Sequence, residues 1–241
     1  MIIGKNFFII EIPKTGTSFL RNYFKKYKNI SLTTHHDTVE HNPKLNLLKK
    51  KYRISIIRSP YSWYLSFWKW SCIKKNMSPL YKDITSQRLK IKRLKFNSNI
   101  FNYIASQITK DTKELKKLFS DVNSKKNFKK VLEILLNKKF KSLISSDFSF
   151  MRQERLGYMT HYFFYQNVLR KHYNILFKSN LNFNQTIKKL DSKIFTNYHF
   201  KTERLTKDLK NFLKKCGLKE TKTSNIDRNK SFKQKNQNIT K

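Results

Sequence analysis

Residues 7–21 constrain the fold more than any other part of this 241-residue chain. The mostly apolar run Phe7-Phe8-Ile9-Ile10-Glu11-Ile12 reads as a buried strand, and helical spacing resumes after Pro13-Lys14-Thr15-Gly16-Thr17-Ser18. A strand, a tight loop and a helix form an anion cradle when backbone N–H groups and the helix N-terminus face the same point. The stretch predicts a site for a phosphorylated or sulfated nucleotide. An ordinary strand-to-helix turn with a Ser or Thr N-cap is the alternative.

The side chains of this loop suit an anion, but their order differs from that of nucleoside triphosphatases. Lys14 supplies a point charge, and three hydroxyl donors follow, namely Thr15, Thr17 and Ser18. In the motif G-x-x-x-x-G-K-[ST], the lysine follows the second glycine and the next residue holds magnesium. Here Lys14 precedes Gly16, the only glycine of the loop. The loop therefore indicates an anion site of another type.

A second strand-to-helix junction follows at residues 53–74. The segment 53–57 predicts a strand that ends at Arg58, and Pro60 lies where a helix over 60–74 would begin. One face of that helix is aromatic and holds Trp63, Phe67 and Trp70. In a kinase or ATPase, a following strand commonly supplies an aspartate for magnesium. Here the strand ends at Arg58, whose positive charge is opposite to that of the aspartate.

The two junctions together resemble the nucleotide site of sulfotransferases that use 3′-phosphoadenosine-5′-phosphosulfate (PAPS). Lys-x-Gly-Thr-[Ser/Thr] after a strand and a proline is similar to their 5′-phosphosulfate loop. Arg58, with Ser66 eight residues later, is similar to their 3′-phosphate site. The resemblance implies PAPS as donor, no metal, and Lys14 as the group that stabilises the leaving phosphate oxygen. The implied nucleotide ligands are Lys14, Thr15, Gly16, Thr17, Ser18, Arg58 and Ser66. Without the resemblance, Arg58 caps a sheet edge and Ser66 fills a small gap.

Two later stretches extend this resemblance. Residues 197–213 resemble the late strand of the family and its Glu-x-Leu-x-x-Asp-Leu helix, and Gly217 predicts the helix end. Asn229-Lys230-Ser231 resembles the Asn-x-Ser of a basic loop that closes over the nucleotide in related enzymes. The similarity covers the first 70 residues and about 195–218.

The resemblance also implies a general base for the acceptor hydroxyl. The segment 36–40 resembles a part of bacterial and Golgi carbohydrate sulfotransferases that ends the second strand in the active-site cleft. It implies His36 as the base, with His35 or Glu40 as alternatives. Plain polar loop residues are the other interpretation. Relatives often carry histidine where this chain has Glu11.

Strands that alternate with helices predict an α/β fold with a central parallel sheet flanked by helices. The resemblance makes this a P-loop-like three-layer fold over residues 1–218, with a helical insertion on the acceptor side at 77–150 and a polar, basic tail at 219–241. Further expected elements are helices over 18–28, 38–50, 159–169 and 183–190 and strands over 30–33 and 173–177.

The formal charge of +38, from 53 Lys and Arg against 15 Asp and Glu, is compatible with nucleic-acid binding. No nucleic-acid fold signature lies beside the lysine runs, so we expect lysines on solvated faces and no specific nucleic-acid partner. The positive field would attract an anionic donor. Two cysteines, no signal peptide and no membrane span predict a cytoplasmic protein.

These features predict a sulfotransferase that moves a sulfuryl group from PAPS to a hydroxyl, with a saccharide as the expected acceptor. A magnesium-dependent P-loop nucleotide kinase is one alternative, although the lysine position and the strand-end arginine do not suit it. A basic nucleic-acid-binding protein is the other alternative, supported by charge alone.

Overall fold

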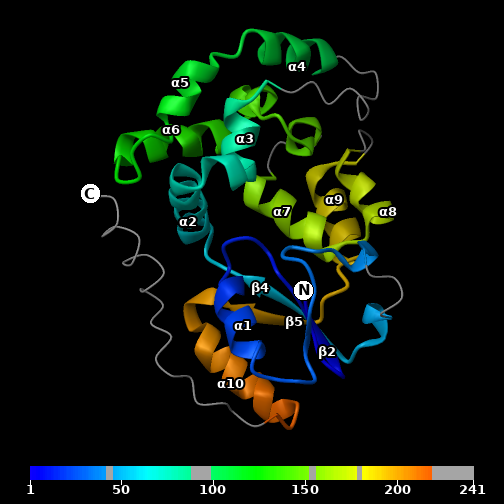
Figure 1. Cartoon of the computed structure of the whole chain (residues 1–241). Helices are drawn as coiled ribbons and strands as arrows, with labels where there is room; N and C mark the ends of the chain where they lie inside the picture. The colour runs from blue at the N-terminus through cyan, green and yellow to red at the C-terminus, as the bar shows by residue number, and fades with distance from the viewer. Residues whose placement is uncertain (42–45, 88–98, 152–155, 178–180, 219–241) are drawn as a thin grey trace, which may run out of the picture. The chain divides into compact units, whose positions relative to one another are not determined.

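The computed structural model describes residues 1–41, 46–87, 99–151, 156–177 and 181–218 (Figure 1). The chain forms two compact units. The first unit joins residues 1–58 to the segment that begins at Thr196, and the second contains residues 59–195. The expected tail at 219–241, with Asn229-Lys230-Ser231, lies outside the described residues.

The first unit contains a five-stranded sheet with the strand order β3-β1-β2-β4-β5. The strands are β1 (Ile2–Ile3), β2 (Phe7–Ile10), β3 (Ser31–Leu32), β4 (Tyr52–Ile57) and β5 (Tyr198–Lys201). Because β2, β4 and β5 run parallel, their carboxyl ends meet at one edge of the sheet. Ligands of open α/β sheets bind at this edge. The loop over residues 13–18, called the cradle loop below, follows β2. Arg58 follows β4, and Thr202 follows β5.

The α/β class is confirmed, but the sheet is mixed: the predicted parallel arrangement holds for β2, β4 and β5. β1 pairs antiparallel with β2 through Ile2 and Ile9, and with β3 through Ile2 and Leu32. The N–H of Gly4 donates to the carbonyl of Phe7 at 2.9 Å and closes the turn between β1 and β2. A two-residue strand is too short to show alternation, which is why the sequence pattern did not reveal β1.

Two helices pack on the same face of this sheet, α1 (Thr17–Phe24) and α10 (Leu205–Lys215) (Figure 1). The shared core consists of Phe7, Ile9, Leu20, Phe24, Ile54, Ile56, Phe200, Leu209, Phe212 and Leu213. The ring of Phe212 meets that of Phe7 edge-on, with centroids 5.1 Å apart. Each such side chain stabilises the fold by roughly 1.5–3 kcal/mol when fully buried. This core fixes α1, and therefore the cradle loop, against the sheet.

α10 ends at the glycine that the sequence pointed to. Gly217 has φ 65°, in the left-handed region. The N–H of Leu218 donates to the carbonyl of Leu213 at 3.0 Å, and the N–H of Gly217 donates to that of Lys214 at 3.2 Å. These are the two bonds of a Schellman motif, so the predicted helix end is confirmed.

The continuous helix predicted over 38–50 is wrong. The described part of this segment forms two 3-10 turns, η1 (Val39–His41) and η3 (Leu47–Lys49). Asn46, directly before the second turn, has φ 46° and ψ 38°, which the interior of an α-helix does not adopt. Residues 42–45 lie outside the described residues.

The second unit packs helices around an aromatic core. α2 (Pro60–Ile73) begins at the predicted proline, and its Trp63 and Phe67 side chains are fully buried. The other helices are α3 (Pro79–Thr85), α4 (Asn99–Ile108), α5 (Thr112–Lys117), α6 (Lys125–Leu136), α7 (Tyr158–Asn167), α8 (Arg170–Tyr173) and α9 (Phe183–Asp191), with 3-10 turns η4 (Lys75–Met77), η6 (Lys138–Leu143), η7 (Asp147–Phe150) and η8 (Asn174–Phe177). Within the described ranges, no helix has the length and apolar character needed to cross a membrane.

The strand predicted at 173–177 is wrong, because this segment is helical. Tyr173 ends α8, and η8 (Asn174–Phe177) follows directly. Tyr173 and Leu176 are both buried, at the spacing of three that a helical turn requires and a strand does not. The hydroxyl of Tyr173 also pairs with Nδ1 of His161 in α7 at 2.6 Å. Tertiary packing overrides the strand preference of these residues.

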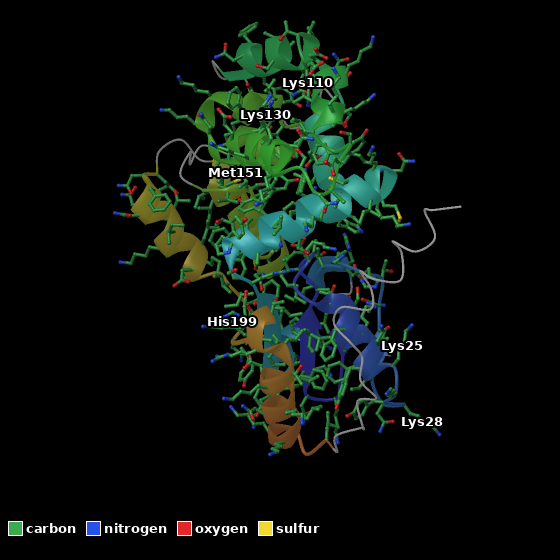
Figure 2. The ribbon with its side chains drawn as sticks, turned by 90° about the vertical axis from the view of Figure 1, so that its left-hand side faces the viewer. Lys25, Lys28, Lys110, Lys130, Met151 and His199 are labelled. Carbon is green, nitrogen blue, oxygen red and sulfur yellow. The ribbon has the colours of Figure 1, made fainter. Side chains whose placement is uncertain are left out.

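One buried lysine joins several segments of the second unit. Lys110 is 4% exposed, and its ammonium group donates to the carbonyls of Asp83 at 3.2 Å, Ser86 at 3.0 Å and Leu143, and to the hydroxyl of Ser145 at 3.1 Å (Figure 2). Burial lowers the pKa of this amine to about 8, opposed by the charge of Asp83. The lysine therefore satisfies acceptors that would otherwise be buried without a donor.

Replacing Lys110 with methionine is expected to destabilise the protein by about 2 kcal/mol, because several buried acceptors lose their donor at once. A urea titration followed by far-UV circular dichroism measures the change. Lys113→Met is the matched control, since Lys113 is exposed in α5, and it should leave the midpoint unchanged. Equal midpoints for the two variants would contradict the role of Lys110.

Candidate functional site

The loop between β2 and α1 adopts the left-handed backbone conformation at two positions. Lys14 has φ 65°, and Gly16 has φ 93°. Gly16 also lies close to the start of α10, since a Cβ added to it would lie 2.6 Å from Cδ2 of Leu205. Both the backbone conformation and the close approach require glycine. α1 then begins at Thr17 with no side-chain cap, so the N–H groups of its first turn suit an anion.

Hydrogen bonds from three segments hold this loop in position. Within the loop, Oγ1 of Thr15 donates to the carbonyl of Ile12 at 2.8 Å. From the end of β4, Nη1 of Arg58 donates to the carbonyl of Lys14 at 2.8 Å. After β5, Oγ1 of Thr202 lies 2.9 Å from the carbonyl of Thr15 and 3.1 Å from the last carbonyl of β4. The loop is therefore braced by the residues that follow β4 and β5.

Two of the three predicted hydroxyl donors are buried. Thr15 is 0% exposed and Thr17 is 5% exposed, whereas Ser18 is exposed on α1. The hydroxyl of Thr15 already donates within the loop, so this side chain supports the cradle. The groups whose chemistry suits an anion are the N–H groups at the start of α1, the hydroxyl of Ser18 and the positive side chains beside the loop.

Lys14 and Arg58 place two positive charges beside the loop. Burial, and next the charge of Arg58, lower the pKa of the Lys14 ammonium group from 10.5 to about 8. Burial also lowers the pKa of Arg58, and the charge of Glu203 opposes that effect. Two neighbouring, partly buried cations disfavour each other's charge, and a bound anion reverses the effect. The arrangement therefore favours an anionic ligand.

The structure places His36 in the same unit as these cations. His36 has φ 57°, and its Nδ1 lies 2.6 Å from the carbonyl oxygen of Glu11, which precedes the cradle loop. Burial is the largest effect on its pKa and lowers it; the hydrogen bond to Glu11 opposes this, and the charge of Lys14 adds to it. A neutral imidazole at neutral pH can accept a proton, as a general base must.

The alternative bases lie in more exposed positions. The side chain of His35 is 50% exposed, and its Nδ1 lies 3.6 Å from Oε1 of Glu11. Glu40 is exposed in η1. His41 pairs with Asp37 at 2.8 Å. His36 is the most buried of the three histidines in this segment.

The two residues predicted to bind the 3′-phosphate, Arg58 and Ser66, belong to different units. Arg58 lies at the sheet edge of the first unit, beside the cradle loop. Ser66 lies in α2 of the second unit and is half-buried. The structure therefore brings Lys14, Gly16 and Arg58 together within one unit, and Ser66 belongs to the other.

Sequence reasoning did not identify Thr202 or Arg21 as site residues. Thr202 contacts a residue 187 positions earlier in the chain. Thr202 directly follows β5, which runs parallel to β4, and this position could have predicted its place at the same sheet edge. Arg21 donates to the buried carboxylate of Glu11 at 2.6 Å. A polar residue one turn into α1 was too common a feature to indicate this contact.

Within the described ranges, no three His, Cys, Asp or Glu side chains are grouped so that they could hold a metal ion.

Comparisons of the chain with protein-family models, with curated proteins and with solved structures find no match.

Proposed function

We propose that this chain is a sulfotransferase that moves a sulfuryl group from PAPS to a hydroxyl of a saccharide. The observation that carries the proposal is the presence of two cations, Lys14 and Arg58, at a glycine-dependent loop at the carboxyl edge of the sheet. PAPS carries anionic groups at both its 5′ and 3′ positions, so two cations and the N-terminus of α1 suit it. The saccharide acceptor follows from the resemblance of residues 36–40.

The residues present fit this donor. The left-handed backbone of Gly16 and its close packing against Leu205 hold the loop in one conformation. The Lys14 ammonium group, whose pKa is lowered by burial and by the charge of Arg58, gains from a bound anion. We further propose that the α/β unit belongs to a P-loop-like three-layer fold; the roles of Ser66 and of residues 77–150 stay predictions of the resemblance. The low cysteine content favours a cytoplasmic location.

In the proposed reaction, the acceptor oxygen forms a bond to sulfur while the bond between sulfur and the 5′-phosphate oxygen breaks. The ammonium group of Lys14 stabilises the negative charge on that leaving oxygen. His36 takes the proton of the acceptor hydroxyl. The products are the sulfate ester of the acceptor and adenosine 3′,5′-bisphosphate. As in phosphoryl transfer, positioning and electrostatic stabilisation supply most of the rate enhancement.

The kinase alternative is less consistent with the charges at the sheet edge. In a kinase, the strand next to the phosphate loop commonly supplies an aspartate that holds magnesium on the nucleotide, whereas β4 is followed by Arg58. The nucleic-acid alternative has only the net charge of +38 in its favour.

A thermal-shift titration tests the proposal against both alternatives. Adenosine 3′,5′-bisphosphate, ATP with magnesium, and a short DNA duplex are compared at equal concentration. We expect the bisphosphate to raise the melting temperature without metal, and Lys14→Ala and Arg58→Ala to lose this stabilisation. Stabilisation by magnesium-ATP alone, or by the duplex alone, would contradict the proposal.

The affinity for adenosine 3′,5′-bisphosphate is expected to fall as the pH rises above about 8. The bound anion favours protonated Lys14, and the pKa of that amine in the free protein is about 8. Above this pH, binding must be coupled to proton uptake, so the dissociation constant increases by up to about tenfold per pH unit. The phosphate groups are already fully ionised in this range and add no pH dependence.

Isothermal titration calorimetry between pH 7 and 9.5 measures this change. Lys14→Arg is the matched control, because arginine stays protonated throughout the range. The pH dependence should disappear in that variant. The same dependence in both proteins would show that another group titrates.

A further inference from the structure

Glu11 is a fully buried carboxylate at the point where β2 enters the cradle loop. Its Oε2 accepts a hydrogen bond from Nη1 of Arg21 at 2.6 Å and lies 2.8 Å from the α-amino group of Met1. Carboxylates are rarely buried unless they are paired. The position therefore has a specific use in this fold.

The partners of Glu11 also bind the segment that carries the histidines. Nη2 of Arg21 donates to the carbonyl of Thr33 at 2.7 Å. The α-amino group of Met1 donates to Oγ1 of Thr33 at 2.8 Å and to the carbonyl of Thr34 at 3.1 Å. One carboxylate thus ties α1 and the N-terminal strand to the chain immediately before His36.

The backbone of Glu11 contacts the ring of His36 directly. Its carbonyl oxygen lies 2.6 Å from Nδ1 of His36. A carbonyl oxygen has no proton to give, so Nδ1 carries the hydrogen and Nε2 of the neutral ring carries the lone pair. This tautomer is the less common one in free histidine. His36 also has φ 57°, in the left-handed region that is strained for a non-glycine residue. The surrounding contacts must hold it there.

The charges around His36 have opposing effects on its pKa. Burial is the largest effect and lowers the pKa, while the hydrogen bond and the charge of Glu11 raise it. The α-amino group of Met1 and the ammonium group of Lys14 lower it further. The ring of His35 lies 5.4 Å from that of His36, between centroids. Glu11 is therefore the one group in this set that supports the basicity of His36.

We propose that Glu11 is the positioning residue of His36. The buried carboxylate of Glu11 fixes the backbone of this residue. The carbonyl oxygen of that backbone then holds the His36 ring so that Nε2 is the proton acceptor. The proposal rests on the proposed function only for the use that the reaction makes of Nε2. The geometry itself can be tested without nucleotide or acceptor.

The first test is the tautomer of His36 in the nucleotide-free protein. Long-range ¹H–¹⁵N correlation spectra of histidine-labelled protein, with His36→Gln to assign the signals, separate protonated from unprotonated ring nitrogens. We expect His36 to carry its hydrogen on Nδ1 above its pKa. A hydrogen on Nε2 in the wild-type protein would overturn the proposal, whatever the variants below do.

The second test compares Glu11→Gln, which removes the charge, with Glu11→Asp, which keeps it. In Glu11→Gln we expect a mixture of His36 tautomers, titration of His36 at lower pH, and a kcat reduced by roughly tenfold, less than the loss of the base itself would cause. The dissociation constant of adenosine 3′,5′-bisphosphate should stay within about twofold, since the cradle is intact. Glu11→Asp should restore a large part of the wild-type behaviour.

Glu133→Gln is the matched control, since Glu133 is an exposed carboxylate on α6. An unchanged tautomer and titration in Glu11→Gln would overturn the proposal. If Glu11→Gln does not fold, Glu11→Gln combined with Arg21→Met removes the carboxylate together with one of its two cationic partners and is examined by the same spectra. A protein that shows the expected tautomer but binds no bisphosphate would contradict the proposed function and leave the positioning role intact.

Discussion

Replacing Lys14 with alanine is expected to lower the turnover of PAPS by about 10³-fold, or roughly 4 kcal/mol of transition-state stabilisation. The ammonium group is the cation that faces the leaving phosphate oxygen in the proposed reaction, and its partly buried surroundings strengthen that interaction. The loss should appear mainly in kcat. It is measured by the release of adenosine 3′,5′-bisphosphate from PAPS in the presence of a mixture of oligosaccharides.

Lys28→Ala is the matched control for this experiment. Lys28 is exposed beyond the end of α1 (Figure 2), so its removal changes the net charge equally but leaves the loop intact. The control should retain wild-type turnover. Equal turnover in Lys14→Ala and wild type would remove Lys14 from the reaction and, with it, the reason for its position before Gly16.

Replacing His36 with alanine is expected to lower kcat by about 10²–10⁴-fold, the usual contribution of a general base. Binding of adenosine 3′,5′-bisphosphate should not change, because His36 acts on the acceptor hydroxyl, which is not part of the bisphosphate. The wild-type pH profile should rise through the pKa of His36, which burial lowers from its ordinary value, and fall above about 8 as Lys14 loses its proton. His36→Ala should lose the acidic limb of this profile.

His41→Ala is the matched control, since His41 is an exposed histidine that pairs with Asp37. It should leave both kcat and the pH profile unchanged. Wild-type turnover in His36→Ala would show that another group, with His35 and Glu40 as the first candidates, accepts the proton.

The parts of the fold that depend on local sequence signals could be predicted. β2, β4 and the start of α2 follow from apolar runs that end in a proline or a charge, and the end of α10 follows from Gly217. Strand direction and short elements could not be predicted, because they depend on partners that are distant in the sequence. β1 has two residues, and its pairing with β2 and β3 becomes visible only when the sheet is assembled.

The same distinction applies to the candidate site. Lys14 and Gly16 lie in the loop after β2, and Arg58 directly follows β4. Their meeting at one sheet edge therefore follows from the parallel order of these strands. The brace from Thr202 and the ion pair of Glu11 with Arg21 could not be predicted in this way. A hydroxyl and a buried carboxylate find their partners through the packing of α1 and α10.

Isothermal titration calorimetry in the presence of EDTA tests the central claim most directly. Adenosine 3′,5′-bisphosphate and adenosine 5′-phosphate, which lacks the 3′-phosphate, are titrated into the full chain at pH 7. A site with Lys14 at one anionic group and Arg58 at the other should bind one equivalent of the bisphosphate without metal, and the monophosphate should bind at least about tenfold more weakly. Equal affinity for the two nucleotides, or no binding of the bisphosphate in EDTA, would contradict the assignment of this loop as a PAPS site.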